Sequence, residues 1–397
     1  MGTDASRRAL LRGMGAGALA LCAAGCNGTM PDLGLGASPE PAASADKAQA
    51  EPEPGKLRVA LLLPLSAAGQ TGVAAASLRN AAEMAVAEFP NSKVALLVKD
   101  DRGAADGGRE AAQQALAEGA EVIVGPLFAP SVQAAGQVAG QAGKPVIAFS
   151  TDAAVAARGV YLLSFMPESE VDRIVGYAAS RGKRSIAAMI PNTAYGTVVT
   201  AAFQEAAARY GVRVAALERY NQDKPSVEVA ARRIAALGDQ ADALLLPDSG
   251  DGLALVAPAL AAAGLGDAKL QLLGTGLWDE PRVFGSRVLQ GGWYAAPDKA
   301  GFNNFAARYR ARFGADPTRI ATLAFDAVFL VNALSSKYGA QAFAEATFTN
   351  PEGVVGTDGL FRFRQDGTNQ RGLAVLQVGA GSSSVISAAP RSFAAGM

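Results

Sequence analysis

Short apolar runs alternate with helix-like segments through most of this 397-residue chain, and this alternation constrains its fold more than any other feature. The run at 58–63 is continuously apolar after its first residue, as expected for a strand buried on both faces of a parallel sheet. Pro64 ends that run, and a helical pattern of apolar residues follows at about 74–89. Repetition of this unit predicts an α/β fold with parallel sheets covered by helices on both faces.

The alternation occurs in two successive series, each long enough for one lobe. The first is expected to contain strands at 58–63, 93–98, 121–125 and 145–149 and helices at 74–89, 106–118 and 131–141. The second is expected to contain helices at 168–181, 197–210, 225–237 and 251–263 and strands at 184–190, 213–219, 242–247 and 270–274. Two more helices, at 302–313 and 318–338, and two short strands around an Asp366–Gly367 turn complete the prediction.

The composition excludes several functions. The chain has 36 basic and 36 acidic residues, so no basic excess points to nucleic acid as a partner. It has no histidine, which excludes Ser-His-Asp triads, Cys-His dyads and His-ligated zinc. No phosphate-binding loop and no Gly-x-Ser-x-Gly motif occurs, and no nucleophile–base pair supports the alternative of a hydrolase. We therefore predict a non-enzymatic protein without a cofactor or a metal.

Residues 1–25 are predicted to form an export signal. Arg7, Arg8 and Arg12 give it a positive start, and the Gly/Ala-rich apolar stretch that follows is too short to span a membrane. The string from Ser6 to Arg12 resembles the twin-arginine export motif, with Leu10 at the position where Phe is usual. An ordinary secretory signal with paired arginines is the alternative.

The only two cysteines, Cys22 and Cys26, lie at the end of this signal. Ala23-Ala24-Gly25-Cys26 resembles a bacterial lipobox, which implies that Cys26 is lipidated. A cysteine beside an ordinary signal-peptidase site is the alternative. Asn27 favours the outer over the inner membrane in lipoproteins of this type. Residues 26–55 are rich in proline and are expected to be a disordered tether, so we predict a periplasmic protein held at a membrane by its lipid.

Polar side chains follow several of the predicted strands, where open α/β sheets bind ligands. The candidate binding residues are Ser66, Ser131, Ser150, Thr151, Tyr195, Asp248 and Trp278. Ser131 opens a helix, whose N-terminus suits a carboxylate, and a helix cap is its structural alternative. A polar turn or a helix cap is the alternative for Ser150 and Thr151, and core packing for Trp278. The adjacent Asp100 and Asp101 are expected to end a strand and turn the chain rather than act as an acid/base pair.

Four strings in this order resemble one known class. They are Val59–Ser66, Val122–Pro126, Lys144–Ala148 and Tyr195-Gly196. Over about residues 56–380 the chain resembles the leucine-binding-protein class of type 1 periplasmic solute-binding proteins. The resemblance implies two Rossmann-like lobes that close on a ligand, joined by crossovers near 164–168, 294–298 and 348–360. The first lobe would comprise 56–166 plus 297–350, and the second 167–296 plus 351–390.

This resemblance also implies roles for the candidate residues. Ser131, Ser150 and Thr151 would hold the carboxylate of a small amino-acid-like solute, and Tyr195 would close over it. Amino-acid binders of this class carry a Glu after the strand that here ends at Gly274, and this Glu pairs with the ligand's ammonium group. Here Thr275-Gly276-Leu277-Trp278 follows instead, which leaves Asp248 and Asp279 as candidates for the missing carboxylate. The expected partners are this small polar solute and an ABC permease.

A second set of strings resembles a particular branch of the class. They are Gly125–Phe128, Leu246–Asp248, Gly274–Asp279 and Gly359–Phe363. The branch consists of lipoprotein activators of penicillin-binding proteins, which use this fold to contact a peptidoglycan synthase and have no established small ligand. The sequence leaves both functions open. We favour solute binding because it requires only the fold and the hydroxyl groups of the first lobe.

Overall fold

The structure is a computed structural model that describes residues 55–266 and 270–393. The predicted export signal, the lipidation site at Cys26 and the tether up to residue 54 lie outside the described residues, so they stay predictions. Among the described helices, none combines the length and the apolar character needed to cross a membrane.

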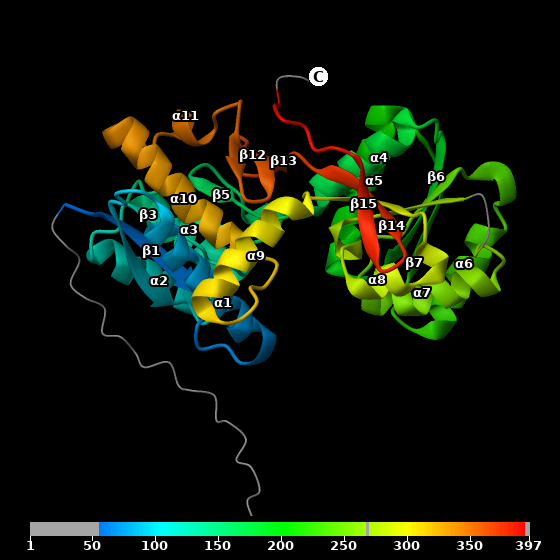
Figure 1. The fold of residues 1–397 in the computed structure, drawn as a ribbon, viewed down its shortest axis with the longest axis horizontal. Helices are drawn as coiled ribbons and strands as arrows, with labels where there is room; N and C mark the ends of the chain where they lie inside the picture. The colour runs from blue at the N-terminus through cyan, green and yellow to red at the C-terminus, as the bar shows by residue number, and fades with distance from the viewer. Residues whose placement is uncertain (1–54, 267–269, 394–397) are drawn as a thin grey trace, which may run out of the picture. The chain divides into compact units, whose positions relative to one another are not determined.

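The first lobe is built on a five-stranded parallel sheet in the order β2-β1-β3-β4-β5. Figure 1 shows β1 and β3 of this sheet in blue and cyan colours near α2 and α3. Its strands are β1 (Leu57–Leu63), β2 (Val94–Asp100), β3 (Val122–Val124), β4 (Val146–Ala148) and β5 (Val160–Leu162). Its helices are α1 (Gly69–Glu88), α2 (Ala105–Ala117), α3 (Ala129–Gln141), α9 (Lys299–Phe313), α10 (Ala321–Tyr338) and α11 (Glu345–Phe348), with short 3-10 helices at Ala153–Val155 and Gly339–Gln341. The predicted βα winding of this lobe is confirmed.

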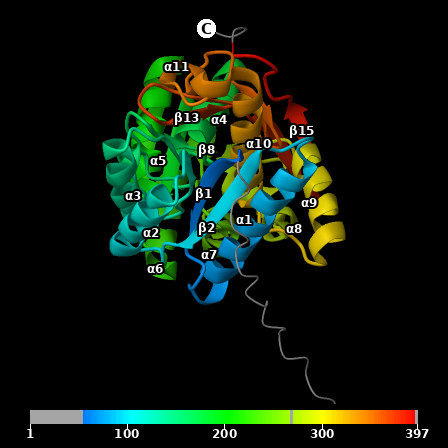
Figure 2. The ribbon, with the colours of Figure 1, turned by 90° about the vertical axis from the view of Figure 1, so that its left-hand side faces the viewer.

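Alternate residues of β1 face two separate helix layers. Val59 and Leu61 belong to the core formed with α1 and α10, whereas Ala60 and Leu62 belong to the core formed with α2 and α3. Figure 2 shows β1 and β2 side by side, with α1 and α2 on opposite sides of them. Because Val59–Leu63 of β1 are fully buried on both faces, this part of the strand appears in the sequence as one unbroken apolar run.

A small antiparallel sheet completes the first lobe and corrects the predicted lobe boundary. It consists of β11 (Val354–Gly356), β12 (Gly359–Phe363) and β13 (Asn369–Arg371), with the expected Asp366–Gly367 turn between the last two strands. Phe361 and Phe363 pack in the same core as Leu61, so residues up to 371 belong to the first lobe and not to the second. The third crossover is therefore at 372–373 and not near 348–360. The first two, at 163–166 and 297–298, lie close to the expected positions.

The second lobe contains a seven-stranded sheet in the order β15-β14-β10-β9-β8-β6-β7. Its strands are β6 (Ser185–Pro191), β7 (Arg213–Tyr220), β8 (Ala243–Leu245), β9 (Gln271–Gly274), β10 (Trp293–Ala296), β14 (Ala374–Gly379) and β15 (Ser382–Ser387). Its helices are α4 (Pro167–Ser180), α5 (Ala194–Tyr210), α6 (Lys224–Ala235), α7 (Gly250–Ala262) and α8 (Pro281–Gly285), with 3-10 helices at Gly238–Gln240, Gly276–Trp278 and Arg287–Leu289.

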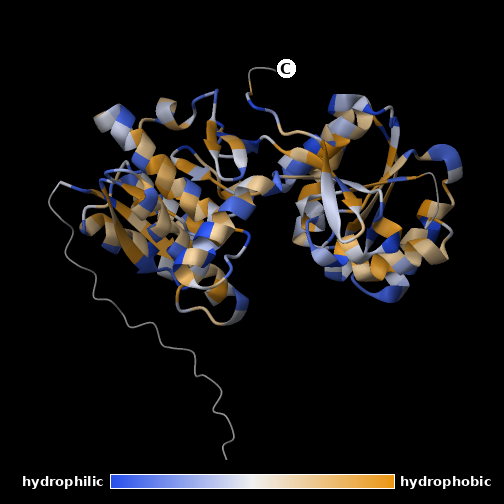
Figure 3. Cartoon of the chain, viewed as in Figure 1, coloured by the Kyte–Doolittle hydropathy of each residue, from blue (hydrophilic) through white to orange (hydrophobic). Residues whose placement is uncertain are grey.

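This second sheet is also covered on both faces. One core contains side chains of α4 and α5, and the other contains side chains of α6, α7 and α8. Figure 3 shows hydrophobic colours gathered on the strands and on the helix faces turned toward them. Strands β5, β10 and β15 were not among the predicted elements, and the tail at about 354–379, expected to hold two strands around the turn, contains β11, β12, β13 and β14. Strands β14 and β15 pair antiparallel at one edge of the sheet, outside the βα alternation on which the prediction relied.

Candidate functional site

Ser131 and Asp101 form a buried pair near the start of α3. Both are fully buried, and Ser131 Oγ donates a hydrogen bond to Asp101 Oδ2 at 2.5 Å. The N–H of Gly103 donates to the other carboxylate oxygen at 3.1 Å. Burial raises the pKa of Asp101 above its ordinary value even though these hydrogen bonds oppose the shift.

The Ser131 hydroxyl proton is thus used inside the first lobe. The Ser131 hydroxyl therefore has no proton left to donate to a solute carboxylate, so the predicted ligand contact through this hydroxyl is not supported. The helix-cap alternative is also wrong, because α3 begins at Ala129 and no side chain caps it. Gly108 allows α2 to approach this pair, since a Cβ at that position would lie 2.4 Å from Ser131 Oγ.

Ser150 and Thr151 lie just after β4, at the carboxyl end of the first sheet. Ser150 is only 4% exposed, and its Oγ accepts a hydrogen bond from the N–H of Asp152 at 3.1 Å. This is the polar turn expected as the structural alternative, but the Ser150 proton is not used by it. Thr151 is exposed, and its hydroxyl makes no hydrogen bond with the described residues. The two side chains therefore provide two free hydroxyl donors.

Ser66 follows β1 and is exposed. It lies beside Asp100, the last residue of β2. Burial raises the pKa of Asp100, but hydrogen bonds led by the Ser66 hydroxyl outweigh it, and the net pKa lies below its ordinary value. Asp100 is therefore ionised at neutral pH. A solute carboxylate at Ser66 would meet this negative charge, which makes Ser66 a poorer anion contact than Ser150 or Thr151.

Tyr195 lies in the first turn of α5, which follows the carboxyl end of β6. Its hydroxyl oxygen is 2.9 Å from Thr275 Oγ1, and Thr275 is fully buried just after β9. Burial raises the pKa of Tyr195 far above its ordinary value, and the nearby charge of Glu170 adds to the effect. The phenol therefore stays protonated and can donate or accept a hydrogen bond at neutral pH.

Glu170, at the start of α4, is a further candidate site residue, which was not among those predicted from the sequence. It is 7% exposed, and its Oε2 accepts a hydrogen bond from the N–H of Gly276 at 2.9 Å. Its Oε1 accepts none from the described residues. Burial raises the pKa of Glu170 to about 8, although the Gly276 N–H and the charge of Arg319 oppose the shift. The sequence signal that could have identified Glu170 is its spacing. A charged residue four and eight positions before Ile174 and Ala178 lies on the apolar face of α4.

The two residues proposed for the missing carboxylate are engaged elsewhere. Asp248 is buried and accepts hydrogen bonds from the Tyr220 hydroxyl at 2.5 Å and from the N–H of Ser249 at 2.8 Å. Asp279 forms an ion pair with Lys299 at 2.6 Å and accepts a hydrogen bond from the Tyr294 hydroxyl. Both carboxylates are thus already partnered within the chain, although these contacts of Asp279 all use its Oδ1.

Trp278 packs within the second lobe, as in its structural alternative. The side chain is fully buried, and its indole N–H donates to the carbonyl oxygen of Leu246 at 2.9 Å. The ring therefore contacts protein on all sides and offers no face for a ligand to stack on. Gly274 makes this packing possible, because a Cβ there would lie 2.2 Å from the indole ring.

Two arginines lie beside the first crossover. Arg371 is buried, and its Nε donates to the carbonyl oxygen of Ser164 at 2.9 Å, while neither of its two terminal nitrogens has a partner among the described residues. Arg319 pairs with Asp358 at 2.7 Å. Both guanidinium groups lie within 5 Å of the ring centre of Phe165. Their positive charge offsets part of the cost of burying Glu170.

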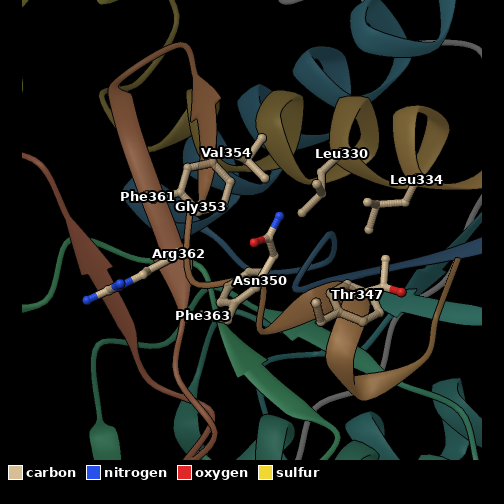
Figure 4. A pocket seen from close by; sticks show the side chains of 10 residues that line it. Leu330, Leu334, Thr347, Asn350, Gly353, Val354, Phe361, Arg362 and Phe363 are labelled. Carbon is tan, nitrogen blue, oxygen red and sulfur yellow. The ribbon is translucent and has the colours of Figure 1, made fainter. Parts of the chain in front are cut away.

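Two cavities lie away from these side chains. The smaller, about 10 Å³, lies between α10, α11 and β12 and has room for about one water molecule. Figure 4 shows Leu330 and Leu334 of α10 on one side of it and Asn350 among its lining residues. The larger, about 320 Å³, lies beside α7. The described residues contain no group of acidic side chains arranged to hold a metal ion.

The chain belongs to the periplasmic binding protein family, whose model matches residues 56–383. No curated protein matches it significantly. Among solved structures, a candidate branched-chain amino acid ABC transporter from Rhodospirillum rubrum superposes with a TM-score of 0.72 at 21% identity, over 83% of this chain and 100% of that one.

Two ligand complexes are also similar. A branched-chain amino acid transporter substrate-binding protein from Streptococcus pneumoniae with isoleucine has a TM-score of 0.59 at 15% identity, over 84% of this chain and 99% of that one. A solute-binding protein of an ABC transporter from Rhodopseudomonas palustris with 3,4-dihydroxybenzoic acid has a TM-score of 0.60 at 19% identity, over 85% and 99%. At these identities the likeness establishes the fold, and it confirms the predicted type 1 two-lobed architecture.

Proposed function

We propose that the protein binds a small solute with both a carboxylate and an ammonium group, and delivers it in the periplasm to an ABC permease. The observation that carries this proposal is the position of Glu170. Its buried carboxylate lies against Gly276, just after β9, and keeps one oxygen free of hydrogen bonds. Relatives bound to an amino acid and to an aromatic acid support the choice of a small carboxylate-bearing solute.

The solute's two charged groups would contact opposite lobes. Its carboxylate would accept hydrogen bonds from Ser150 and Thr151 after β4, and its ammonium group would pair with Glu170. Charge-assisted hydrogen bonds of this kind contribute roughly 1.5–3 kcal/mol each. An ammonium group beside Glu170 would also favour the ionised carboxylate. Binding would therefore lower the pKa of Glu170, which burial raises in the ligand-free protein.

A thermal-shift screen of the body from residue 55 tests the proposal. The panel contains neutral amino acids, the amines that lack their carboxylate and the acids that lack their ammonium group. Only solutes with both groups are expected to raise the melting temperature strongly. A ligand at one hundred times its dissociation constant stabilises the native state by about 2.7 kcal/mol. Equal shifts by the acids and the amino acids would contradict the role of Glu170.

Activation of a penicillin-binding protein is the second candidate function, and one observation favours it. Ser131, Asp248 and Trp278 are all engaged with other protein groups, so fewer of the predicted contact residues are free for a solute. A protein with this role would show no shift with any solute and would bind a purified peptidoglycan synthase in a concentration-dependent way. Both functions fit a lipid anchor at Cys26, which we propose from the sequence alone.

A further inference from the structure

A cavity of about 320 Å³ lies on the second lobe between α7 and the segment formed by α8 and the 3-10 helix Arg287–Leu289. Its floor is apolar and buried: Leu253 and Ala257 come from α7, and Val283 and Leu289 come from the facing segment. The volume is within the range of roughly 300–1,000 Å³ that is usual for small-molecule sites. The floor therefore suits an apolar group of moderate size.

The rim of the cavity carries one cationic side chain, Arg282. Its guanidinium pairs with Asp251, but the two side chains are 67% and 85% exposed. An ion pair this exposed contributes little to stability, about 0–1 kcal/mol, so a ligand carboxylate can replace Asp251 at small cost. Ser286, which is half-buried, adds a hydroxyl group to the lining.

The N-terminus of α7 does not supply a competing anion site. The N–H of Gly250, its first residue, donates to the carboxylate of Glu280. Arg282 is consequently the group on this rim that distinguishes an anion from a neutral molecule. None of the residues of the proposed solute site lines this cavity.

We propose that this cavity is a second small-molecule site, which takes a compound with an apolar body and a single carboxylate. The apolar body lies on the floor formed by Leu253, Ala257, Val283 and Leu289, and the carboxylate pairs with Arg282 at the rim. This site is independent of the solute site that contains Ser150, Thr151 and Glu170.

Octanoate and octanol, titrated into the body from residue 55, test this proposal. The protein carries Ser150→Ala and Thr151→Ala, so that octanoate cannot use those hydroxyls. We expect saturable octanoate binding that Ala254→Trp abolishes, because Ala254 lies exposed on the rim and an indole there fills the cavity. Ala262→Trp is the matched control, since Ala262 is exposed on the same helix and does not line the cavity.

Arg282→Gln tests the charge. It is expected to weaken octanoate about tenfold, which corresponds to roughly 1.4 kcal/mol, and to leave octanol unchanged. Gly285→Leu is a second blocking variant if Ala254→Trp does not fold, because nothing lies within 4 Å of a Cβ at Gly285. Folding is checked by circular dichroism and melting temperature.

Three outcomes would overturn the proposal. The first is no saturable binding. The second is binding that both blocking variants leave intact. The third is equal loss of octanoate and octanol in Arg282→Gln. Octanoate binding by the parent protein that the Ser150→Ala, Thr151→Ala protein lacks would place octanoate in the solute site, which refutes the second site while leaving the proposed function intact.

Discussion

Glu170 Oε2 accepts a hydrogen bond from the N–H of Gly276 at 2.9 Å, although the two residues are 106 positions apart in the sequence. A Cβ on Gly276 would lie 2.6 Å from the other carboxylate oxygen, so only glycine allows Glu170 to approach this closely. The resemblance to amino-acid binders implied a glutamate after β9, but the sequence has Thr275-Gly276-Leu277-Trp278 there. In the structure, a carboxylate reaches the same strand end from α4.

Glu170 makes stability depend on pH. Its pKa is raised from 4.5 to about 8 by burial, so between these values the folded state binds more protons than the unfolded state. The free energy of unfolding of the ligand-free protein therefore falls as pH rises from about 4.5 to about 8. Asp326, whose pKa burial raises to about 6, acts in the same direction up to that pH.

The Glu170→Gln variant isolates this contribution. We expect its melting temperature to fall less than that of the parent between pH 6 and pH 8. This range lies above the pKa of Asp326, about 6, and below that of Glu170, about 8. Melting curves of both proteins across this range provide the measurement. Parallel pH profiles would show that Glu170 does not titrate there.

Ser131→Ala is expected to lower stability without changing solute affinity. The substitution leaves the buried Asp101 without its 2.5 Å donor, which costs about 1–3 kcal/mol. For a body of this size we expect a drop of a few degrees in melting temperature. Loss of solute affinity at unchanged stability would contradict the structural role of Ser131.

Ser150→Ala combined with Thr151→Ala is expected to show the opposite pattern. Neither hydroxyl donates a hydrogen bond within the described residues, so the melting temperature of the ligand-free protein changes little. Solute affinity falls about tenfold or more, because two donors to the carboxylate are lost. Calorimetric titration of the variant with the best solute of the screen measures this effect. An unchanged affinity would move the carboxylate contact elsewhere.

Cys26→Ser is expected to release the protein from the membrane. A lipoprotein anchored by several acyl chains stays in the membrane fraction, whereas the variant has none and appears among soluble periplasmic proteins. Fractionation with intact-mass measurement of the parent provides the check. A parent mass without acyl chains would refute lipidation.

Local sequence patterns predicted the βα core well, because strands buried on both faces appear as continuous apolar runs. The run at Val59–Leu63 in β1 is an example. Patterns of this kind did not predict β15 or separate β14 from the strands around the turn, because β14 and β15 depend on antiparallel pairing at a sheet edge. They also misplaced the third crossover, because the packing of Phe361 and Phe363 in the first core depends on contacts between distant segments.

The candidate site was predicted only in part, for the same reason. Ser150 and Thr151, which stay candidates, were proposed from their position after a strand, which is local information. The partners of Ser131 and Asp248 come from distant segments, since Asp101 follows β2 and Tyr220 ends β7, and these hydrogen bonds engage both candidate residues. Glu170 was missed because its role appears only when α4 is placed against Gly276.

Calorimetric titration of the Glu170→Gln variant is the most direct test of the account. The titrants are the best amino-acid ligand and the corresponding acid without its ammonium group, with Glu110→Gln, an exposed carboxylate on α2, as the matched control. We predict that Glu170→Gln weakens binding of the amino acid at least about tenfold, leaves binding of the acid unchanged, and removes the gain in affinity as Glu170 ionises toward pH 8. Equal affinities of the parent and Glu170→Gln for the amino acid would contradict it.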